Sequence, residues 1–334
     1  MFYRLNGIPI VKLIDKTEFW IIESNNDYII KENDISSDLD FELVNLRMLI
    51  ADLIFGSRKK YYDILPIVPQ WIPYAGIDSE LKISKEDFEK LVSKINEENT
   101  FKLLYYYDID YLIGTIQNSI QESRNLFCGF YKEFNINDFM LAEKPFNKNS
   151  VMFASGRLVT SVFSKINQLF ISLYSQLDFI TKLAFEIENL QTEFTKYKKL
   201  KSANLLFGSN KKLTYSDSEK ISTLFEKNVR NIQIIQTLRN EVVHNASLQN
   251  IQKIYQIFNN DKLIEKFILI PDFDKNGNIK SFKNRKRFFD SEIKLNQILP
   301  DLLFDFWIRE MKTIELIKNS CQQLSIVLHR SETE

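Results

Sequence analysis

The sequence predicts a mainly α protein, with a helical bundle in its C-terminal half and a smaller α+β domain before it. Apolar residues recur every three or four positions from Val151 to about Tyr197, and such a stripe needs helical partners to cover it. Residues 2–31 instead hold short β-branched and aromatic segments separated by turns, which is typical of strands. A polar segment containing Pro145 separates the two patterns. We therefore predict domains at residues 1–147 and 148–334.

The N-terminal domain is expected to begin with strands and continue with helices. The predicted strands are Ile8–Ile14, Phe19–Ile22 and Tyr28–Lys31. A helix should run from about residue 37 to 55 and end at Gly56, and three prolines make residues 57–80 a loop. Ser84 has the character of an N-cap for a helix that reaches about residue 98.

The next helix, about residues 103–134, is rich in aromatic residues. Tyrosine and phenylalanine alternate there with leucine and isoleucine at helical spacing. Such rings either form a core or offer a surface on which nucleic-acid bases stack. The helical spacing favours the core.

The C-terminal domain should contain three helices and a β-hairpin insertion. The long helix from Val151 is followed by a basic loop at residues 198–216. Ser216 or Ser218 can cap the next helix, which continues to about residue 238. Two strands at residues 267–270 and 279–282 flank Asn276-Gly277, a strong hairpin turn. The last helix is expected over residues 301–328.

Composition restricts the function classes. Lys+Arg and Asp+Glu both number 44, so the net charge is zero. The protein therefore lacks the excess of positive charge with which a protein coats nucleic acid, and any contact with RNA must be local. Cys128 and Cys321 belong to no CxxC pair, which argues against a thiolate zinc site and fits a reducing, cytoplasmic setting. Charges between Lys12 and Glu18 interrupt the N-terminal segment, so we expect no signal peptide and no membrane association.

The stretch from Leu238 to Asn245 has the strongest chemical character. It holds Arg239, Asn240 and His244, one of only two histidines in the chain. RNA carries its own nucleophile, the 2′-hydroxyl, so cleavage needs a base, an acid and positive charge on the transition state. An imidazole can move the protons near neutral pH, and a guanidinium suits phosphate oxygens.

The spacing within this stretch restricts how the residues can cooperate. On an ideal helix Asn240 and His244 lie about 40° apart, so the amide can orient the imidazole. Arg239 and His244 lie about 140° apart on the same helix. They address one phosphate only if the helix breaks near Thr237, which could then cap a new helix, or if a second copy completes the site.

The Arg-Asn-x3-His pattern resembles the signature of HEPN-domain proteins, within a segment of about residues 150–330. The resemblance implies an α-helical bundle that dimerises, with two motifs facing one cleft. It implies an endoribonuclease that needs no metal or cofactor, acting as a toxin or anti-phage effector. Arg239, Asn240 and His244 are the matching positions, and Asp178 and Lys182 on the preceding helix correspond more loosely to supporting residues. The N-terminal 145 residues are not covered, and the hairpin insertion departs from the minimal HEPN core.

Basic residues on two loops are the expected RNA contacts, although two solvated loops explain them equally well. They are Lys199, Lys201, Lys283, Arg285, Lys286 and Arg287. The segment Asp272–Gly277 also mimics the start of a calcium loop, but its twelfth position is Lys283 rather than glutamate. The expected partners are RNA, a second copy of the chain, and an antitoxin or defence-system protein.

Two alternatives to the ribonuclease stay open. One is a catalytically inactive HEPN-like helical module that binds or scaffolds a partner. The other is a substrate for nucleotide transfer by another enzyme.

Overall fold

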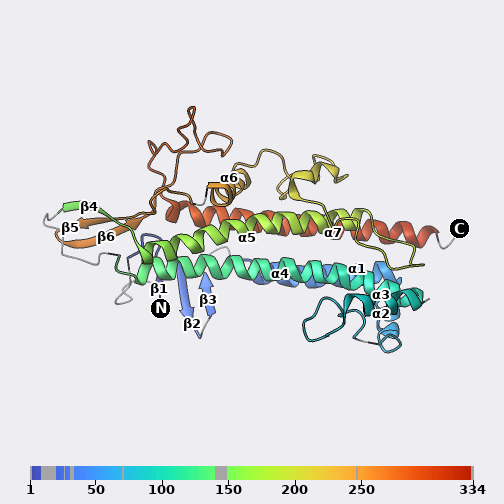
Figure 1. The fold of residues 1–334 in the computed structure, drawn as a ribbon. Helices are drawn as coiled ribbons and strands as arrows, with labels where there is room; N and C mark the ends of the chain where they lie inside the picture. Colours follow the sequence, from blue (N-terminus) through green and yellow to red (C-terminus); the bar gives the residue numbers. More distant parts are fainter. Residues whose placement is uncertain are drawn as a thin grey trace. The chain divides into compact units, whose positions relative to one another are not determined.

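The computed structural model describes residues 2–8, 20–25, 27–30, 34–69, 71–95, 97–139, 149–245 and 247–331 (Figure 1). This part of the chain is helix-rich, with two small sheets. Its helices are α1 (Ser36–Phe55), α2 (Arg58–Ile64), α3 (Lys85–Lys94), α4 (Glu98–Ile136), α5 (Arg157–Glu188), α6 (Arg230–Asn245) and α7 (Leu295–Ser331), with the 3-10 helix η1 at Phe207–Lys212. Its strands are β1 (Phe2–Tyr3), β2 (Ile21–Ser24), β3 (Asp27–Ile30), β4 (Asn149–Ala154), β5 (Ile254–Asn259) and β6 (Lys262–Phe267).

The chain forms two compact units that do not follow its linear order. Unit 1 comprises Met1–Ser37, Ser119–Ser175 and Glu226–Arg309, and unit 2 comprises Asp38–Asn118, Gln176–Phe225 and Glu310–Glu334. Helices α4, α5 and α7 contribute to both units. Each unit takes in residues from both sides of position 147, so the predicted domain boundary stays a prediction.

Unit 1 contains both sheets, each antiparallel, in the orders β1-β2-β3 and β4-β5-β6. Its segments of α4, α5 and α7 lie side by side (Figure 1). The Phe127 and Phe304 ring centroids are 6.0 Å apart, and the Ser172 hydroxyl donates to the Glu122 carboxylate over 3.1 Å. Both contacts join neighbouring helices of this three-helix core.

Helix α7 contains a proline in its second turn. Pro300 has no backbone N–H, so the carbonyl of Asn296, four residues earlier, loses its helical donor. The buried Tyr131 hydroxyl donates to that carbonyl over 2.5 Å instead. The Asn296 side chain meanwhile accepts from the Ile268 N–H and donates to the Leu5 carbonyl. Hydrogen bonds thus join the start of α7 to α4, to the N-terminal segment at Leu5 and to the segment at Ile268.

Unit 2 contains α1, α2 and α3 with its own segments of the long helices. The buried Tyr105 hydroxyl of α4 donates to Glu186 of α5 over 2.8 Å. Arg47 of α1 pairs with Asp110 of α4. The Ser84 hydroxyl accepts from the Asp87 N–H over 3.0 Å, which confirms Ser84 as the N-cap of α3.

The structure confirms several predicted elements. Helix α1 matches the predicted helix 37–55. Strands β2 and β3 overlap the second and third predicted strands, shifted by two residues and by one. The first predicted strand, Ile8–Ile14, lies outside the described residues except for Ile8. The aromatic rings of α4 form core, because all but Tyr107 and Tyr111 among the predicted rings are buried.

Other predicted elements are wrong in position. The helix expected from Val151 begins only at Arg157, because residues 149–154 form β4 and Gly156 adopts a φ of 126°. Residues 216–229 are turns rather than helix, so α6 begins at Arg230. The last helix begins at Leu295 rather than Asp301, since the Tyr131 contact lets it pass through Pro300.

The predicted β-hairpin insertion exists between the motif and the last helix, but in different strands. It is formed by β5 and β6, which turn at Asn260 and Asp261 with φ values of 48° and 59°. Two successive positive φ values are those of a tight hairpin turn. The Asn276-Gly277 turn also forms, with only the isolated Phe273–Ile279 bridge beside it. Among the described residues, no helix is both long and apolar enough to cross a membrane.

Candidate functional site

The motif lies at the C-terminal end of α6. Ile232, Ile234, Ile235 and Leu238 bury the apolar face of this helix, and the Asn231 amide donates to Asp305 of α7 over 3.1 Å. The helix is continuous from Arg230 to Asn245, so of the two arrangements considered, the break near Thr237 does not occur. Thr237 does not cap a new helix, and its hydroxyl contacts the Gln233 amide at 3.3 Å.

The guanidinium of Arg239 is held by two neighbours. Its central carbon lies 4.6 Å from the centroid of the Tyr174 ring, an arrangement in which the ring face attracts the cation. One guanidinium nitrogen donates to the Asn240 side-chain oxygen over 3.0 Å. Arg239 is half-buried, so its neighbours do not enclose it completely.

Asn240 differs from its predicted role. We expected its amide to orient the imidazole of His244, but within one chain its oxygen accepts from Arg239. Because the Arg239 guanidinium lies on the Tyr174 ring, one of its N–H groups is next to the Asn240 side chain. The Asn240 oxygen therefore accepts from Arg239 and not from His244. In the described part of the chain, no hydrogen bond joins Asn240 and His244.

His244 occupies the last turn of α6 and is exposed, like Val243 and Asn245 beside it. The side chain is not enclosed in apolar packing. It is therefore accessible to a substrate or to a second copy of the chain.

Residues 270–291 form a loop that lies along α6. A Cβ on Gly277, whose φ is +91°, would lie 2.7 Å from the Arg230 carbonyl oxygen, so only glycine lets the turn approach the start of α6 this closely. The Gln233 amide donates to Asn278 over 3.1 Å. The buried Asp272 carboxylate accepts from the N–H groups of Asp290 and Ser291, which closes the base of the loop.

The same loop is attached to the other end of α6 through Arg287. Its guanidinium donates to the Ser247 carbonyl over 2.9 Å and to the Asn250 side chain over 2.5 Å. It also lies 3.5 Å from the Glu241 carboxylate. The loop is thus fixed at both ends of α6, and its basic residues are brought beside the motif.

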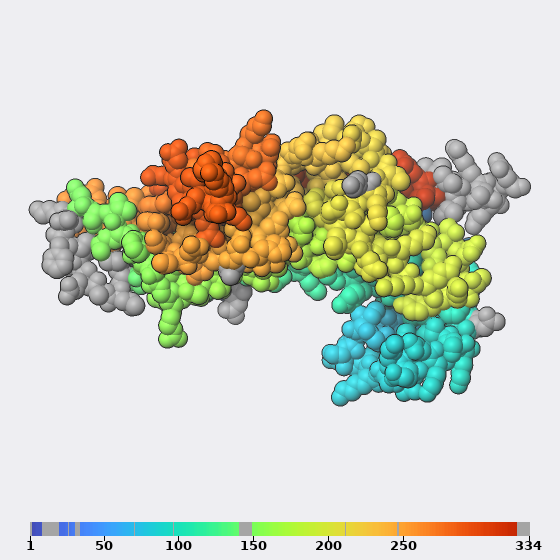
Figure 2. Space-filling model, turned by 45° about the horizontal axis from the view of Figure 1, so that its top comes forward, coloured from blue at the N-terminus to red at the C-terminus, as the bar shows by residue number. Residues whose placement is uncertain are grey.

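A polar cavity of about 450 Å³ opens between the loop and the end of α6. Its lining consists of Glu241, Asn245, Asn250, Asn284, Arg285, Lys286 and Arg287. Three cations face one carboxylate there, which suits a phosphate group. Figure 2 shows residues 270–290, in darker orange, forming a raised part of the surface. Lys283 directly precedes the lining residue Asn284 in the sequence. It is exposed, and its ammonium group lies over the Phe282 ring.

The remaining predicted site residues belong to unit 2. Asp178 accepts from the Phe207 N–H over 2.7 Å, and Lys182 lies 5.8 Å from the Phe179 ring centroid. Lys201 donates to the Asn189 carbonyl over 2.7 Å, at the end of α5. Lys199 is exposed. Local contacts thus account for three of these four, and no ion pair joins Asp178 to Lys182 in the described chain.

Sequence reasoning missed the partners that orient the motif. Tyr174 lies one position after Leu173 of the apolar stripe of α5 and carries no signal of its own. Glu241 lies within the motif, but its contact with Arg287 joins segments 46 residues apart and depends on the loop.

No protein-family model matches the chain, and no curated protein or solved structure is significantly similar to it. The HEPN resemblance therefore rests on the motif residues themselves.

Proposed function

We propose that this chain is an endoribonuclease of HEPN type, which cleaves RNA at a site that two copies of α6 complete together. The observation that carries this proposal is the exposed His244 at the end of an unbroken helix, with Arg239 already oriented by Tyr174. An imidazole and a guanidinium are the two groups that the reaction needs most. RNA is the expected substrate, and an anti-phage or toxin role is the biological setting that the motif suggests.

A second copy follows from the geometry of one helix. His244 lies five positions after Arg239, so on an unbroken helix the two side chains point about 140° apart. One phosphate cannot meet both side chains of the same α6. In a two-fold dimer, Arg239 of one copy can face His244 of the other, which forms the site across the interface.

The chemistry proceeds by attack of the 2′-hydroxyl on the adjacent phosphorus. His244 performs one of the two proton transfers, taking the 2′ proton or protonating the leaving 5′ oxygen, and solvent water performs the other. Arg239 stabilises the extra negative charge of the transition state. The products are a 2′,3′-cyclic phosphate and a free 5′-hydroxyl. Because the substrate supplies its own nucleophile, no metal-bound water is needed, and cleavage in EDTA should equal cleavage without it.

Mixing two inactive variants tests the shared site directly. We expect Arg239→Ala and His244→Ala each to lower cleavage of a labelled RNA by about 10²–10⁴-fold. If the site takes one residue from each copy, the mixture forms heterodimers with one intact site and recovers about a quarter of the parent activity. A site within one chain recovers nothing on mixing.

The inactive-module alternative makes a different prediction. A scaffold that retains only the helical shape leaves RNA intact, and both substitutions leave its behaviour unchanged. Growth of cells that express the parent and His244→Ala separates the two cases further. The nuclease slows growth and the variant relieves it, whereas equal growth contradicts a toxic role.

A further inference from the structure

Three aromatic rings form a row across the sheet β4-β5-β6. Phe153, Tyr255 and Phe267 lie directly opposite one another in the strand register. The centroids of Phe153 and Tyr255 are 6.2 Å apart, and those of Tyr255 and Phe267 are 5.2 Å apart with nearly parallel planes. The pairs stabilise the sheet, but they also make a continuous π surface on one face.

The row is open at one end and closed at the other. The Phe153 side chain is 54% exposed, Tyr255 is half-buried, and Phe267 is only 7% exposed. Val151, two positions before Phe153 on the same face, is exposed as well. Phe153 and Val151 together leave an exposed apolar strip on this face of the sheet, and contiguous apolar surface is typical of interaction sites.

A lysine ammonium group lies over the ring at each end of the row. Lys253 Nζ lies 4.6 Å from the Phe153 ring centroid, and Lys294 Nζ lies 4.6 Å from that of Phe267. Lys294 is neutralised by Glu265, at 2.6 and 2.8 Å. Lys253 makes no ion pair with any residue in the described chain, so its charge at the open end is available to an anion.

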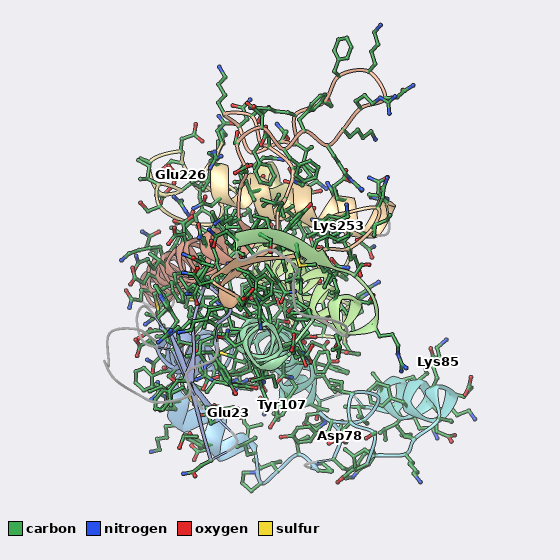
Figure 3. The ribbon with its side chains drawn as sticks, turned by 90° about the vertical axis from the view of Figure 1, so that its left-hand side faces the viewer. Glu23, Asp78, Lys85, Tyr107, Glu226 and Lys253 are labelled. Carbon is green, nitrogen blue, oxygen red and sulfur yellow. The ribbon has the colours of Figure 1, made fainter. Side chains whose placement is uncertain are left out.

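The row is continuous with the basic cavity beside α6. A shallow, mainly apolar cavity of about 400 Å³ is lined by Lys253, Tyr255, Leu269 and Phe289, and also by Asn250 and Arg287. The last two residues line the basic cavity as well. In Figure 3, Glu226 is labelled near the start of α6 and Lys253 beyond its end. The surface thus changes from basic side chains to exposed rings over neighbouring residues of unit 1.

We propose that the face of β4-β5-β6 carrying Phe153 and Tyr255 is a stacking platform for single-stranded RNA, which it leads toward the end of α6. Bases stack on Phe153 and Tyr255, while Lys253 and Arg287 contact the phosphates between them. A single strand fits because its base faces are free, whereas a duplex hides them. This inference rests on the proposed function for the identity of the nucleic acid, and it assigns the strandedness of the substrate.

Binding of a fluorescein-labelled oligouridylate of about 12 nucleotides, followed by anisotropy, tests the platform. The measurement uses His244→Ala protein so that the RNA stays intact. We expect Phe153→Ala to weaken binding about tenfold and Phe153→Trp to retain it. Tyr111→Ala is the matched control, because Tyr111 is a similarly exposed ring, 59% exposed, on α4, and it should bind as the parent does.

Lys253→Ala should weaken binding several-fold and lower the dependence of log affinity on log salt by about one unit. Equal binding by Phe153→Ala and the parent, tighter binding of a duplex than of the single strand, or no RNA binding at all overturns the platform. The last result would favour a protein partner on this sheet face. Cleavage by the parent is assayed beside binding. Cleavage with unchanged Phe153→Ala binding rejects only the platform, whereas Phe153-dependent binding without cleavage rejects only the nuclease.

Discussion

Aromatic side chains are buried to different extents in two regions of this chain, helix α4 and strand β4. The rings of α4 are almost all buried, Phe130 and Tyr131 completely so, whereas Phe153 on β4 stands more than half exposed. A central helix is surrounded by neighbours, so rings on most of its sides enter a core. A strand alternates its residues between two faces, so Phe153 points away from the core while Ala154 points into it. Aromatic content alone therefore predicts burial poorly, and the periodicity of the element decides.

The largest expected effect is on stability in α4. Phe130 is fully buried and stacks with Phe134 at 5.3 Å, so Phe130→Ala should lower the free energy of unfolding by about 3–5 kcal/mol. Chemical denaturation measures this loss. A cost below about 1 kcal/mol would mean that the core around Phe130 is loosely packed, and the contrast with the sheet would disappear.

Lys266 connects the two regions and should give the next largest effect. It comes from β6, is 2% exposed, and donates to the carbonyls of Phe134, Asn135 and Asn137 at the end of α4, over 3.1, 3.1 and 2.8 Å. Lys266→Met keeps the apolar stem and removes the donor. We expect a loss of about 1–3 kcal/mol in the free energy of unfolding at pH 7.

The same residue predicts a pH dependence. Burial lowers the pKa of the Lys266 ammonium from its ordinary value of 10.5 to about 8. Above pH 8 the folded chain has lost this proton while the unfolded chain still holds it, so stability rises with pH across this window. The free energy of unfolding of the parent should therefore rise relative to Lys266→Met between about pH 8 and pH 10. A constant difference would show that the carbonyls keep the ammonium charged.

Tyr174 represents a third setting, a ring that holds a cation. Tyr174→Leu should lower RNA cleavage by about 3- to 30-fold with little change in melting temperature, because it removes the ring face beneath Arg239. Tyr174→Phe should restore most of the activity. If Leu and Phe behave alike, the ring acts only by filling space.

The smallest expected effect is on the stability of the sheet. Phe153→Ala should change the free energy of unfolding by less than about 1 kcal/mol, because more than half of the side chain is already in water. Thermal melting beside the Phe130→Ala protein gives the comparison. A loss similar to that of Phe130→Ala would make Phe153 part of the core and would leave no reason to assign it a binding role.

Local signals in the sequence placed α1 and the start of α3 closely, because caps and apolar periodicity act within a few residues. Residues 57–80, predicted as a loop, nevertheless contain α2. Ser84 capped α3 as expected, and the predicted helix in residues 37–55 differs from α1 by one residue. The start of α7 was predicted six residues too late, because the contact that accommodates Pro300 comes from a distant part of the sequence. The Tyr131 hydroxyl, 165 residues away from Asn296, donates to the carbonyl that Pro300 leaves without its helical donor.

The candidate site was predictable in its residue types but not in its contacts. The positions of Arg239 and His244 follow from their spacing on one helix. The Tyr174 contact and the placement of the basic loop do not, since they depend on packing between distant segments and on the close approach of Gly277 to α6. The hairpin was misplaced because Asn276-Gly277 gives a stronger turn signal than Asn260-Asp261, whereas strand pairing with β4 decided the outcome.

The unbroken α6 has a consequence for dosage. Under the proposed function a single chain is inactive, because its imidazole and guanidinium point in different directions. The rate of RNA cleavage therefore depends on the fraction of chains that are paired. Activity per molecule should then grow with protein concentration and level off once pairing is complete. A cell could carry a few copies without harm, and a rise in synthesis or a scaffold that gathers the chains would release the damage.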